Sequence, residues 1–145
     1  MHVSDLLRIK GSSVVTVRPD DDVRALLALL AEHHIGAVVV SADGAAIDGI
    51  VSERDVARAL NRQGAAVLSH EVSSIMTAEV RSCAPDTHLD ELSQVMTEGR
   101  FRHVPVVMDG RMVGIVSIGD VVKSRMTELE VERDSLSSYI RTAST

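Results

Sequence analysis

Two short segments of this sequence have residue types and spacing suited to binding a phosphate and a sugar. They are Ser-Glu-Arg-Asp at residues 52–55 and Ser-Ile-Gly-Asp at residues 117–120, and each directly follows an apolar run that predicts a buried strand. A helix that begins at such a serine presents unpaired backbone amides and the positive end of its dipole to a nearby phosphate. A carboxylate one turn into that helix can accept hydrogen bonds from both hydroxyls of a ribose.

The same pattern also serves a purely structural purpose. A serine at the N-cap accepts a hydrogen bond from the third amide of the helix, and an acidic residue three positions later accepts one from the amide of the cap itself. A single Ser-x-x-Asp segment therefore needs no ligand to explain it. Its presence twice, at matching positions of a repeat, favours a binding role.

The elements that position these segments belong to one motif that occurs twice in the sequence. Val-Arg-Pro-Asp at residues 17–20 aligns with Cys-Ala-Pro-Asp at 83–86, 66 residues further on, and Gly-Ile-Val-Ser at 49–52 aligns with 114–117 at a spacing of 65. Each copy predicts an extended segment before Pro-Asp, an amphipathic helix, two β-branched strands joined by an Asp-Gly turn, and a second helix. The expected strands are residues 14–17, 35–40 and 47–51 in the first copy and 80–83, 103–107 and 112–116 in the second. The predicted fold is α/β with mixed sheets, built from two β-α-β-β-α repeats.

Further helices are expected outside the two copies. Residues 3–9 and 70–76 predict short lead-in helices, and residues 61–66 predict a helix end followed by a linker. After Val122 the last helix continues, with Val122, Leu129 and Leu136 at heptad spacing and Met126 and Ile140 beside them. Two alternatives remain open for this tail, which either packs on its own domain or contacts a partner chain. The expected boundaries are 1–64 for the first repeat with its lead-in helix, 65–123 for the second repeat and 124–145 for the helical tail.

Composition argues against several classes of function. The net charge of −6 and the presence of only one Phe, one Tyr and no Trp disfavour binding to nucleic acid or anionic lipid. Cys83, the single cysteine, cannot form an internal disulfide and is expected to be an inert buried thiol. No stretch approaches 18 uncharged apolar residues, so we expect no membrane segment and a cytoplasmic location. The histidines and acidic residues show no spacing typical of metal ligands, and no metal is expected.

These features together resemble a pair of CBS (cystathionine-beta-synthase-type) domains, also called a Bateman module, over almost all of residues 1–123. The resemblance rests on the paired Gly-x-x-Ser-x-x-Asp segments, the Pro-Asp helix entries, the strand Phe-Arg-His-Val-Pro-Val-Val at 101–107 and the spacing of the copies. It implies two units related by a pseudo-two-fold axis, with two clefts between their sheets. In such clefts, family members bind adenosine ligands such as AMP, ADP, ATP, S-adenosylmethionine or NAD(H).

The resemblance also implies which residues line each cleft. In the first, Asp55 would hold the ribose, Ser52 and the helix amides the phosphate, and the backbone of residues 101–103 the adenine edge. In the second, Asp120 would take the ribose role. The first cleft would thus combine Ser52, Arg54 and Asp55 with Leu89, Phe101, Arg102 and His103, and the second Ser117, Gly119 and Asp120 with Val23, Ile35, Gly36 and Ala37.

The two clefts differ in charge at matched positions. The second cleft has Gly119 where the first has Arg54, and Gly36 where the first has Arg102. Guanidinium groups bind phosphates through paired, charge-assisted hydrogen bonds. The first cleft is therefore expected to prefer a more highly phosphorylated ligand or a dinucleotide.

The function expected from these observations is a regulatory sensor of adenosine nucleotides, not an enzyme. Its ligand would be AMP, ADP or ATP, with NAD(H) as a further candidate, and its signal would pass to an effector protein that the sequence does not identify. A homodimer is expected through the CBS helices, with the tail as an additional contact; the apolar rows offered for it are Val23, Leu27 and Leu30, and Leu92 and Met96. Two alternatives are a structural homodimerisation module without a ligand and a nucleotide-hydrolysing enzyme, for which Asp55 or Asp120 would need a metal or a water-activating partner.

Overall fold

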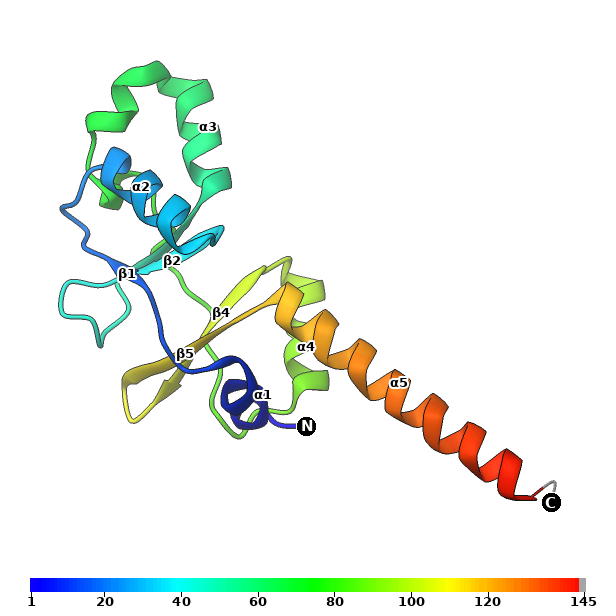
Figure 1. Cartoon of the computed structure of the whole chain (residues 1–145). Helices are drawn as coiled ribbons and strands as arrows, with labels where there is room; N and C mark the ends of the chain where they lie inside the picture. The colour runs from blue at the N-terminus through cyan, green and yellow to red at the C-terminus, as the bar shows by residue number, and fades with distance from the viewer. Residues whose placement is uncertain (144–145) are drawn as a thin grey trace.

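The computed structural model describes residues 1–143 and contains the two expected repeats (Figure 1). Both are mixed α/β units, and the long C-terminal helix is present, which confirms the predicted fold. The first repeat comprises β1 (Thr16–Val17), α2 (Val23–His33), β2 (Ala37–Val40), β3 (Gly49–Ser52) and α3 (Glu53–Gln63); the second comprises α4 (Leu89–Gly99), β4 (His103–Met108), β5 (Arg111–Ser117) and α5 (Ile118–Ala143). Helix α1 (Val3–Lys10) precedes them, and two 3₁₀ helices, η1 (Gly64–Ser69) and η2 (Val72–Ser74), connect them.

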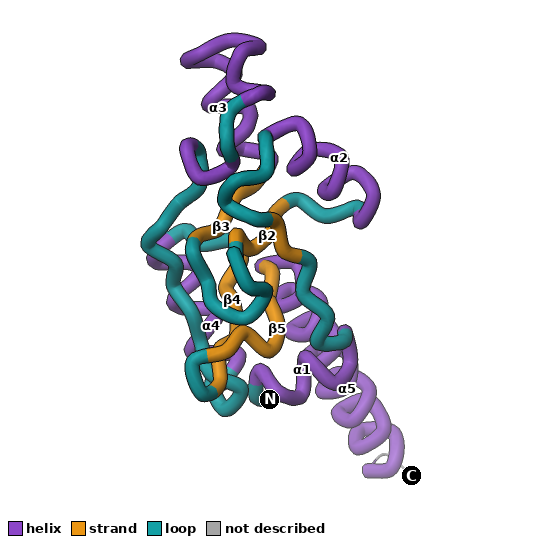
Figure 2. Tube along the Cα trace, turned by 90° about the vertical axis from the view of Figure 1, so that its left-hand side faces the viewer, coloured by secondary structure: helices purple, strands orange, loops and turns teal. Residues whose placement is uncertain are grey.

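The strands lie in the middle of the molecule, with α2 and α3 at one end and α1, α4 and α5 at the other (Figure 2). In the first sheet β1 pairs in parallel with β2, and β2 pairs antiparallel with β3. In the second sheet β4 and β5 form an antiparallel pair. Each Ser-x-x-Asp segment thus begins at the last residue of β3 or β5 and opens the following helix.

Two local predictions need correction. The strand expected at 80–83 is reduced to Cys83, which makes an isolated parallel bridge to Val106. Val80 and Arg81, which precede it, belong to no strand and line a cavity between the repeats. The lead-in helix expected at 70–76 is only the short 3₁₀ turn η2, since Glu71 instead forms a bridge to Asp22 of the first repeat.

Each repeat has its own hydrophobic core. Val23, Leu26 and Leu30 of α2 are buried against the first sheet, and Leu92 and Met96 of α4 are buried against the second. The apolar rows that the sequence offered for a dimer contact therefore face inward, except for Leu27, which is only partly buried. A buried row cannot supply an intermolecular surface, so any dimer must use other residues.

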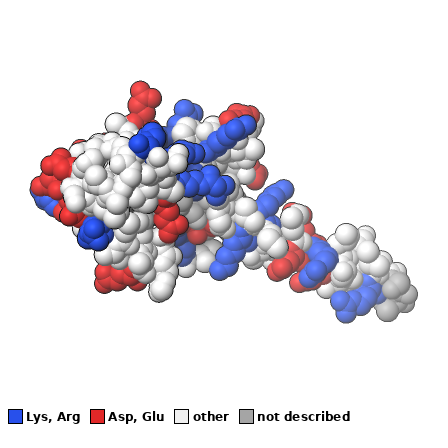
Figure 3. Space-filling view, turned by 90° about the horizontal axis from the view of Figure 1, so that it is seen from above, with Lys and Arg blue, Asp and Glu red and all other residues white. Residues whose placement is uncertain are grey.

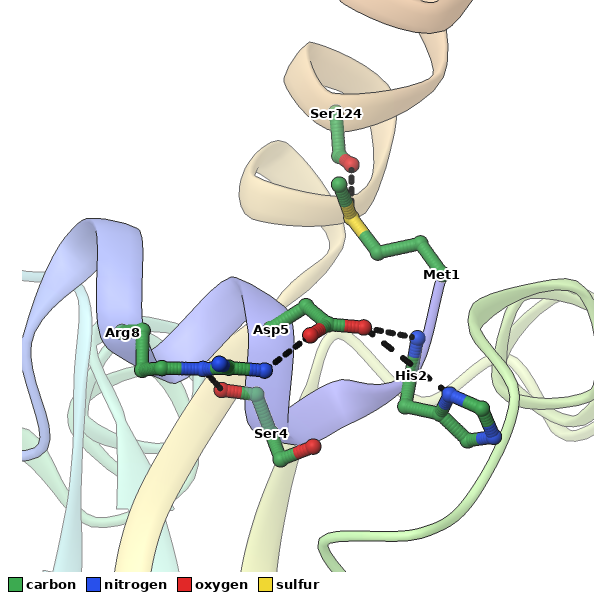
Figure 4. Close-up of polar contacts among 6 residues, drawn as sticks. All are labelled: Met1, His2, Ser4, Asp5, Arg8 and Ser124. Carbon is green, nitrogen blue, oxygen red and sulfur yellow. Dashed lines mark hydrogen bonds and ion pairs between the residues drawn. The ribbon is translucent and has the colours of Figure 1, made fainter.

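Helix α1 packs against the second repeat, although it precedes the first in the chain. Val3 and Leu6 are buried in the second core. The amide of Val3 donates to the carbonyl of Thr87 at 2.9 Å, and the Ser124 hydroxyl lies 3.0 Å from the sulfur of Met1. Figure 4 shows this junction, in which Met1 reaches α5. The helix therefore ends beside the strand β5, where its last residue, Lys10, meets the second Ser-x-x-Asp segment.

No helix within residues 1–143 is long and apolar enough to cross a membrane. The longest helix, α5, leaves the body of the protein and extends well beyond it (Figure 1).

Candidate functional site

A cavity of about 420 Å³ lies between the two repeats, at the start of α3. This volume is within the range of small-molecule sites. Four segments meet around it: the beginning of β2, the junction of β3 with α3, the connection from Thr77 to Arg81, and the turn between α4 and β4. The lining residues are Gly36, Ala37, Ile50, Val51, Ser52, Glu53, Arg54, Asp55, Arg58, Thr77, Glu79, Val80, Arg81, Gly99, Arg100, Phe101, Arg102 and His103.

The start of α3 is held by a reciprocal cap. The Ser52 amide donates to Oδ2 of Asp55 at 2.8 Å, and the Asp55 amide donates to the Ser52 hydroxyl at 3.3 Å. The Ser52 hydroxyl also donates to the same carboxylate oxygen at 3.0 Å. Within the described residues, Oδ1 of Asp55 accepts no hydrogen bond from the protein. The cap therefore fixes the carboxylate through one oxygen and leaves the other for a ligand hydroxyl.

Five arginines surround this cavity: Arg54 and Arg58 from α3, Arg81 from the connection, and Arg100 and Arg102 from the turn before β4. Within residues 1–143, none of these five guanidinium groups forms an ion pair or hydrogen bond with another group of the protein. The acidic lining residues are Glu53, Asp55 and Glu79, so the lining is positive although the chain as a whole carries −6. A cluster of unpaired guanidinium groups is suited to a polyanion.

Phe101 stands at the rim of the cavity with 36% of its surface exposed. Its ring packs over Gly99, where no side chain would fit. A second hollow of about 440 Å³ adjoins the first and shares Arg54, Arg100, Phe101 and Arg102 with it. Three of the five arginines therefore border both hollows.

Six of the seven residues predicted for the first cleft line this cavity: Ser52, Arg54, Asp55, Phe101, Arg102 and His103. The seventh, Leu89, is 6% exposed and belongs to the second core. Its side chain packs at the start of α4, where a hydrophobic residue is needed to hold that helix on its sheet, so it does not reach the cavity.

The residues predicted for the second cleft are distributed differently. Gly36 and Ala37 line the first cavity, whereas Val23 is fully buried in the first core and Ile35 packs against it. Ser117, Gly119 and Asp120 do lie together at the start of α5. The Ser117 amide donates to Asp120 at 2.9 Å, and the Asp120 amide donates to the Ser117 hydroxyl at 3.1 Å.

The second Ser-x-x-Asp segment is already occupied by a side chain of the protein. The ammonium of Lys10 donates to Oδ2 of Asp120 at 2.5 Å and to the carbonyl of Ile115 at 2.8 Å. Both partners are largely screened from solvent, with side-chain exposures of 28% for Lys10 and 25% for Asp120. The carboxylate that corresponds to Asp55 is thus engaged by a cation from α1.

Burial and nearby charges shift two pKa values around this second segment. Burial tends to raise the pKa of Asp120, but the hydrogen bonds from Lys10 and from Ser117 outweigh it and hold the pKa below its usual value. The pKa of His103 is lowered, mainly by burial, with Lys10 and Arg102 adding to the effect and Asp120 opposing it. His103 therefore presents a neutral ring to the cavity at neutral pH.

Sequence reasoning missed several lining residues. Arg58 follows Arg54 by four positions on one helix, and this spacing places both on the same face, so it could have been found. Arg81 and Arg100 carried no comparable signal, because they belong to irregular segments whose path depends on how the repeats pack. Burial raises the pKa of the Cys83 thiol to about 11, which agrees with the expected inert role. Among the residues that the structure describes, no group of three or more His, Cys, Asp or Glu could hold a metal ion.

The chain is similar to several known CBS-domain proteins. A CBS-domain-containing mitochondrial protein of Arabidopsis thaliana, CBSX3, is 37% identical over 96% of this chain and 71% of its own length. The crystal structure of a CBS-domain protein from Agrobacterium tumefaciens superimposes with a TM-score of 0.83 and 51% identity, over 86% of this chain and 99% of the other. The structure of CBSX2 in complex with AMP superimposes with a TM-score of 0.72 and 26% identity, over 87% of this chain and 96% of the other.

The sequence model of the CBS domain matches the chain twice, at residues 3–62 and 72–127. Two matches of this extent agree with the internal repeat, with the two cores and with the paired Ser-x-x-Asp caps. The chain therefore belongs to the CBS domain family, as a protein with two CBS domains.

Proposed function

We propose that this protein is a regulatory module that binds one adenosine nucleotide per chain, in the arginine-rich cavity between its repeats, and that it favours ligands with several phosphates. ATP, ADP and dinucleotides such as NAD(H) fit this description better than AMP. Binding would change the position of the two repeats relative to each other, and an effector protein would recognise this change.

The observation that carries the proposal is the set of five unpaired guanidinium groups beside a helix start with a free carboxylate oxygen. Each component corresponds to one part of a nucleotide. Oδ1 of Asp55 would accept from the ribose hydroxyls, while the amides at the start of α3 and Arg54 would hold the first phosphate. The adjoining hollow would take the rest of a polyphosphate chain or the second half of a dinucleotide, between Arg100 and Arg102.

The related CBSX2 structure supports the adenosine part of the proposal, because its complex contains AMP. The neutral ring of His103 and the backbone beside Phe101 would face the adenine. Homodimerisation is a further part of the proposed behaviour, since a regulator that reports through association needs a second copy. The Ser52 hydroxyl and one oxygen of the Asp55 carboxylate are engaged with each other in the cap of α3, so we propose binding without turnover.

Isothermal titration calorimetry of nucleotide-free protein with AMP, ATP, NAD and NADH would test the proposal. Asp55→Asn should lower the affinity for every ligand by roughly tenfold or more, because a hydrogen bond to a charged group is worth about 1.5–3 kcal/mol. Arg102→Gln should lower the affinity for ATP by a similar factor and leave the affinity for AMP nearly unchanged. Arg62→Gln is the matched control, since Arg62 lies near the end of the same α3 helix and does not line the cavity.

Three results would contradict the proposal. Absence of binding by folded, nucleotide-free protein would favour a structural module. Equal loss of affinity in the Arg62 and Arg102 variants would show that only general charge matters. Release of phosphate from ATP at a rate that Asp55→Asn abolishes would favour an enzyme.

A further inference from the structure

The C-terminal helix carries an apolar stripe that its own chain leaves uncovered. The stripe consists of Val122, Met126, Leu129, Leu136 and Ile140, and each of these residues is 49–60% exposed. Together with Arg133 they follow one another at alternating spacings of four and three residues, which is the repeat of a coiled coil. In this helix of 26 residues, such a row leaves an apolar face exposed to water.

The stripe is distinct from the face that α5 uses to pack on its own repeat. Val121 and Ser124 are the buried residues of this helix, and they lie beside Leu89 and Ser93 of α4. At 100° per residue, the stripe is rotated by about 120° from that face. From residue 130 to residue 143 every side chain of the helix is exposed, and Figures 1 and 3 show this part standing clear of the body.

The charges beside the stripe identify a suitable partner. The helix carries both basic and acidic side chains (Figure 3): Lys123 and Arg125 come first, and Glu128, Glu130 and Glu132 follow. In a parallel pair of identical helices in register, Arg125 would lie beside Glu130 of the second copy. The two Arg133 side chains would face each other, each beside Glu132 of the other copy. An antiparallel pair with the stripes fully overlapped would instead place Glu130 opposite Glu130 and Glu132 opposite Glu132. Opposite charges at these flanking positions set the partner and the orientation of coiled coils.

The existing contacts of Arg125 do not prevent this arrangement. Its guanidinium lies 3.2 Å from Glu128 and 3.9 Å from Asp90, and all these groups are at the surface. Exposed ion pairs contribute little and exchange partners readily. The polar Arg133 within the row would weaken the pair but fix its register.

We propose that the stripe on α5 is a dimerisation surface that pairs in parallel and in register with the same stripe of a second copy of this chain. The two bodies would then lie at the same end of a paired helical stalk. The proposal rests on the exposed row and its flanking charges, and it holds whether or not the cavity binds a nucleotide.

Disulfide trapping in the full chain tests the pairing. In a Cys83→Ser background, Leu136→Cys places a thiol within the stripe, and Ser138→Cys places one on the opposite side of the same turn as a matched control. We expect mild oxidation to link Leu136→Cys chains at least tenfold faster than Ser138→Cys chains, as read on a non-reducing gel. Adding Leu129→Glu to the Leu136→Cys chain should abolish the difference.

Circular dichroism of each variant establishes that it is folded before oxidation. Equal rates for the two cysteine positions in folded protein would overturn the proposal. So would efficient linking between Val122→Cys and Ile140→Cys chains in a mixture, because only antiparallel helices bring these two positions together.

Discussion

At the scale of single residues, the two repeats use the same backbone geometry and differ in what they place on it. The Glu53 amide donates to the carbonyl of Gly36 at 3.0 Å, and the Ile118 amide donates to the carbonyl of Arg102 at 2.8 Å. The equivalence of these two hydrogen bonds shows that Gly36 and Arg102 hold matching positions. Both residues line the same cavity, so Arg102 brings to it a positive charge that Gly36, at the matching position of the first repeat, does not.

Arg100 illustrates a cost of this arrangement. It ends α4 with a left-handed φ of 56°, and its counterpart His34 ends α2 with a φ of 54°. Residues with a Cβ are disfavoured there, and glycine is the usual choice. The first repeat has no evident need for His34, whereas Arg100 lines both hollows.

We expect Arg100→Gly and His34→Gly each to stabilise the protein by up to about 1 kcal/mol, because glycine relieves the left-handed strain. Only Arg100→Gly should also weaken ATP binding. Urea unfolding measures the first effect and calorimetric titration the second. Unchanged ATP affinity in Arg100→Gly would remove this residue from the site.

At the scale of elements, the connection between the repeats determines the shape of the cavity. Residue Thr77 pairs with Ile50 in an antiparallel bridge, which brings the following residues across β3. This approach is possible because Gly49 has no side chain. A Cβ at that position would lie 2.7 Å from the sulfur of Met76 and 2.8 Å from the carbonyl oxygen of Thr77.

Gly49→Ala should therefore destabilise the protein by about 1–3 kcal/mol, since the backbone of the connection must move. Gly36→Ala is the control, because Gly36 lies in the bend just before β2, the strand that pairs with β3. Its nearest neighbour would be Glu53 at 3.9 Å, so we expect a change within about 0.5 kcal/mol. Similar losses of stability for both variants in urea unfolding would show that the cost does not come from the contact of Gly49 with the connection.

At the scale of the whole molecule, α1 breaks the symmetry that the repeats would otherwise have. It packs on the second repeat, where Leu7 fills the space above Gly114, and it delivers Lys10 to Asp120. One cleft is left open and basic, while the carboxylate of the other is neutralised from within the chain. A nucleotide that used Asp120 would first have to displace Lys10.

The expected stoichiometry is therefore one nucleotide per wild-type chain. Lys10→Met keeps most of the apolar stem and removes the ammonium, and we expect it to reveal a second, weaker site that Asp120→Asn then eliminates. The number of sites comes from titration at protein concentrations well above the Kd of the first site. Two sites in the wild type, or only one in Lys10→Met, would show that Lys10 does not block a second nucleotide site at Asp120.

The repeat, the caps at Ser52 and Ser117 and the elements of each copy, apart from the strand expected at 80–83, could be predicted from the amino-acid sequence. Those features depend on residues close together in the chain, where apolar periodicity and capping act directly. The tertiary structure alone decided that Arg81 and Arg100 join Arg54, that Leu89 is a core residue, and that α1 covers the second repeat. Lys10 and Asp120 are 110 positions apart. Such contacts follow from the packing of whole elements against each other, and no local pattern encodes that packing.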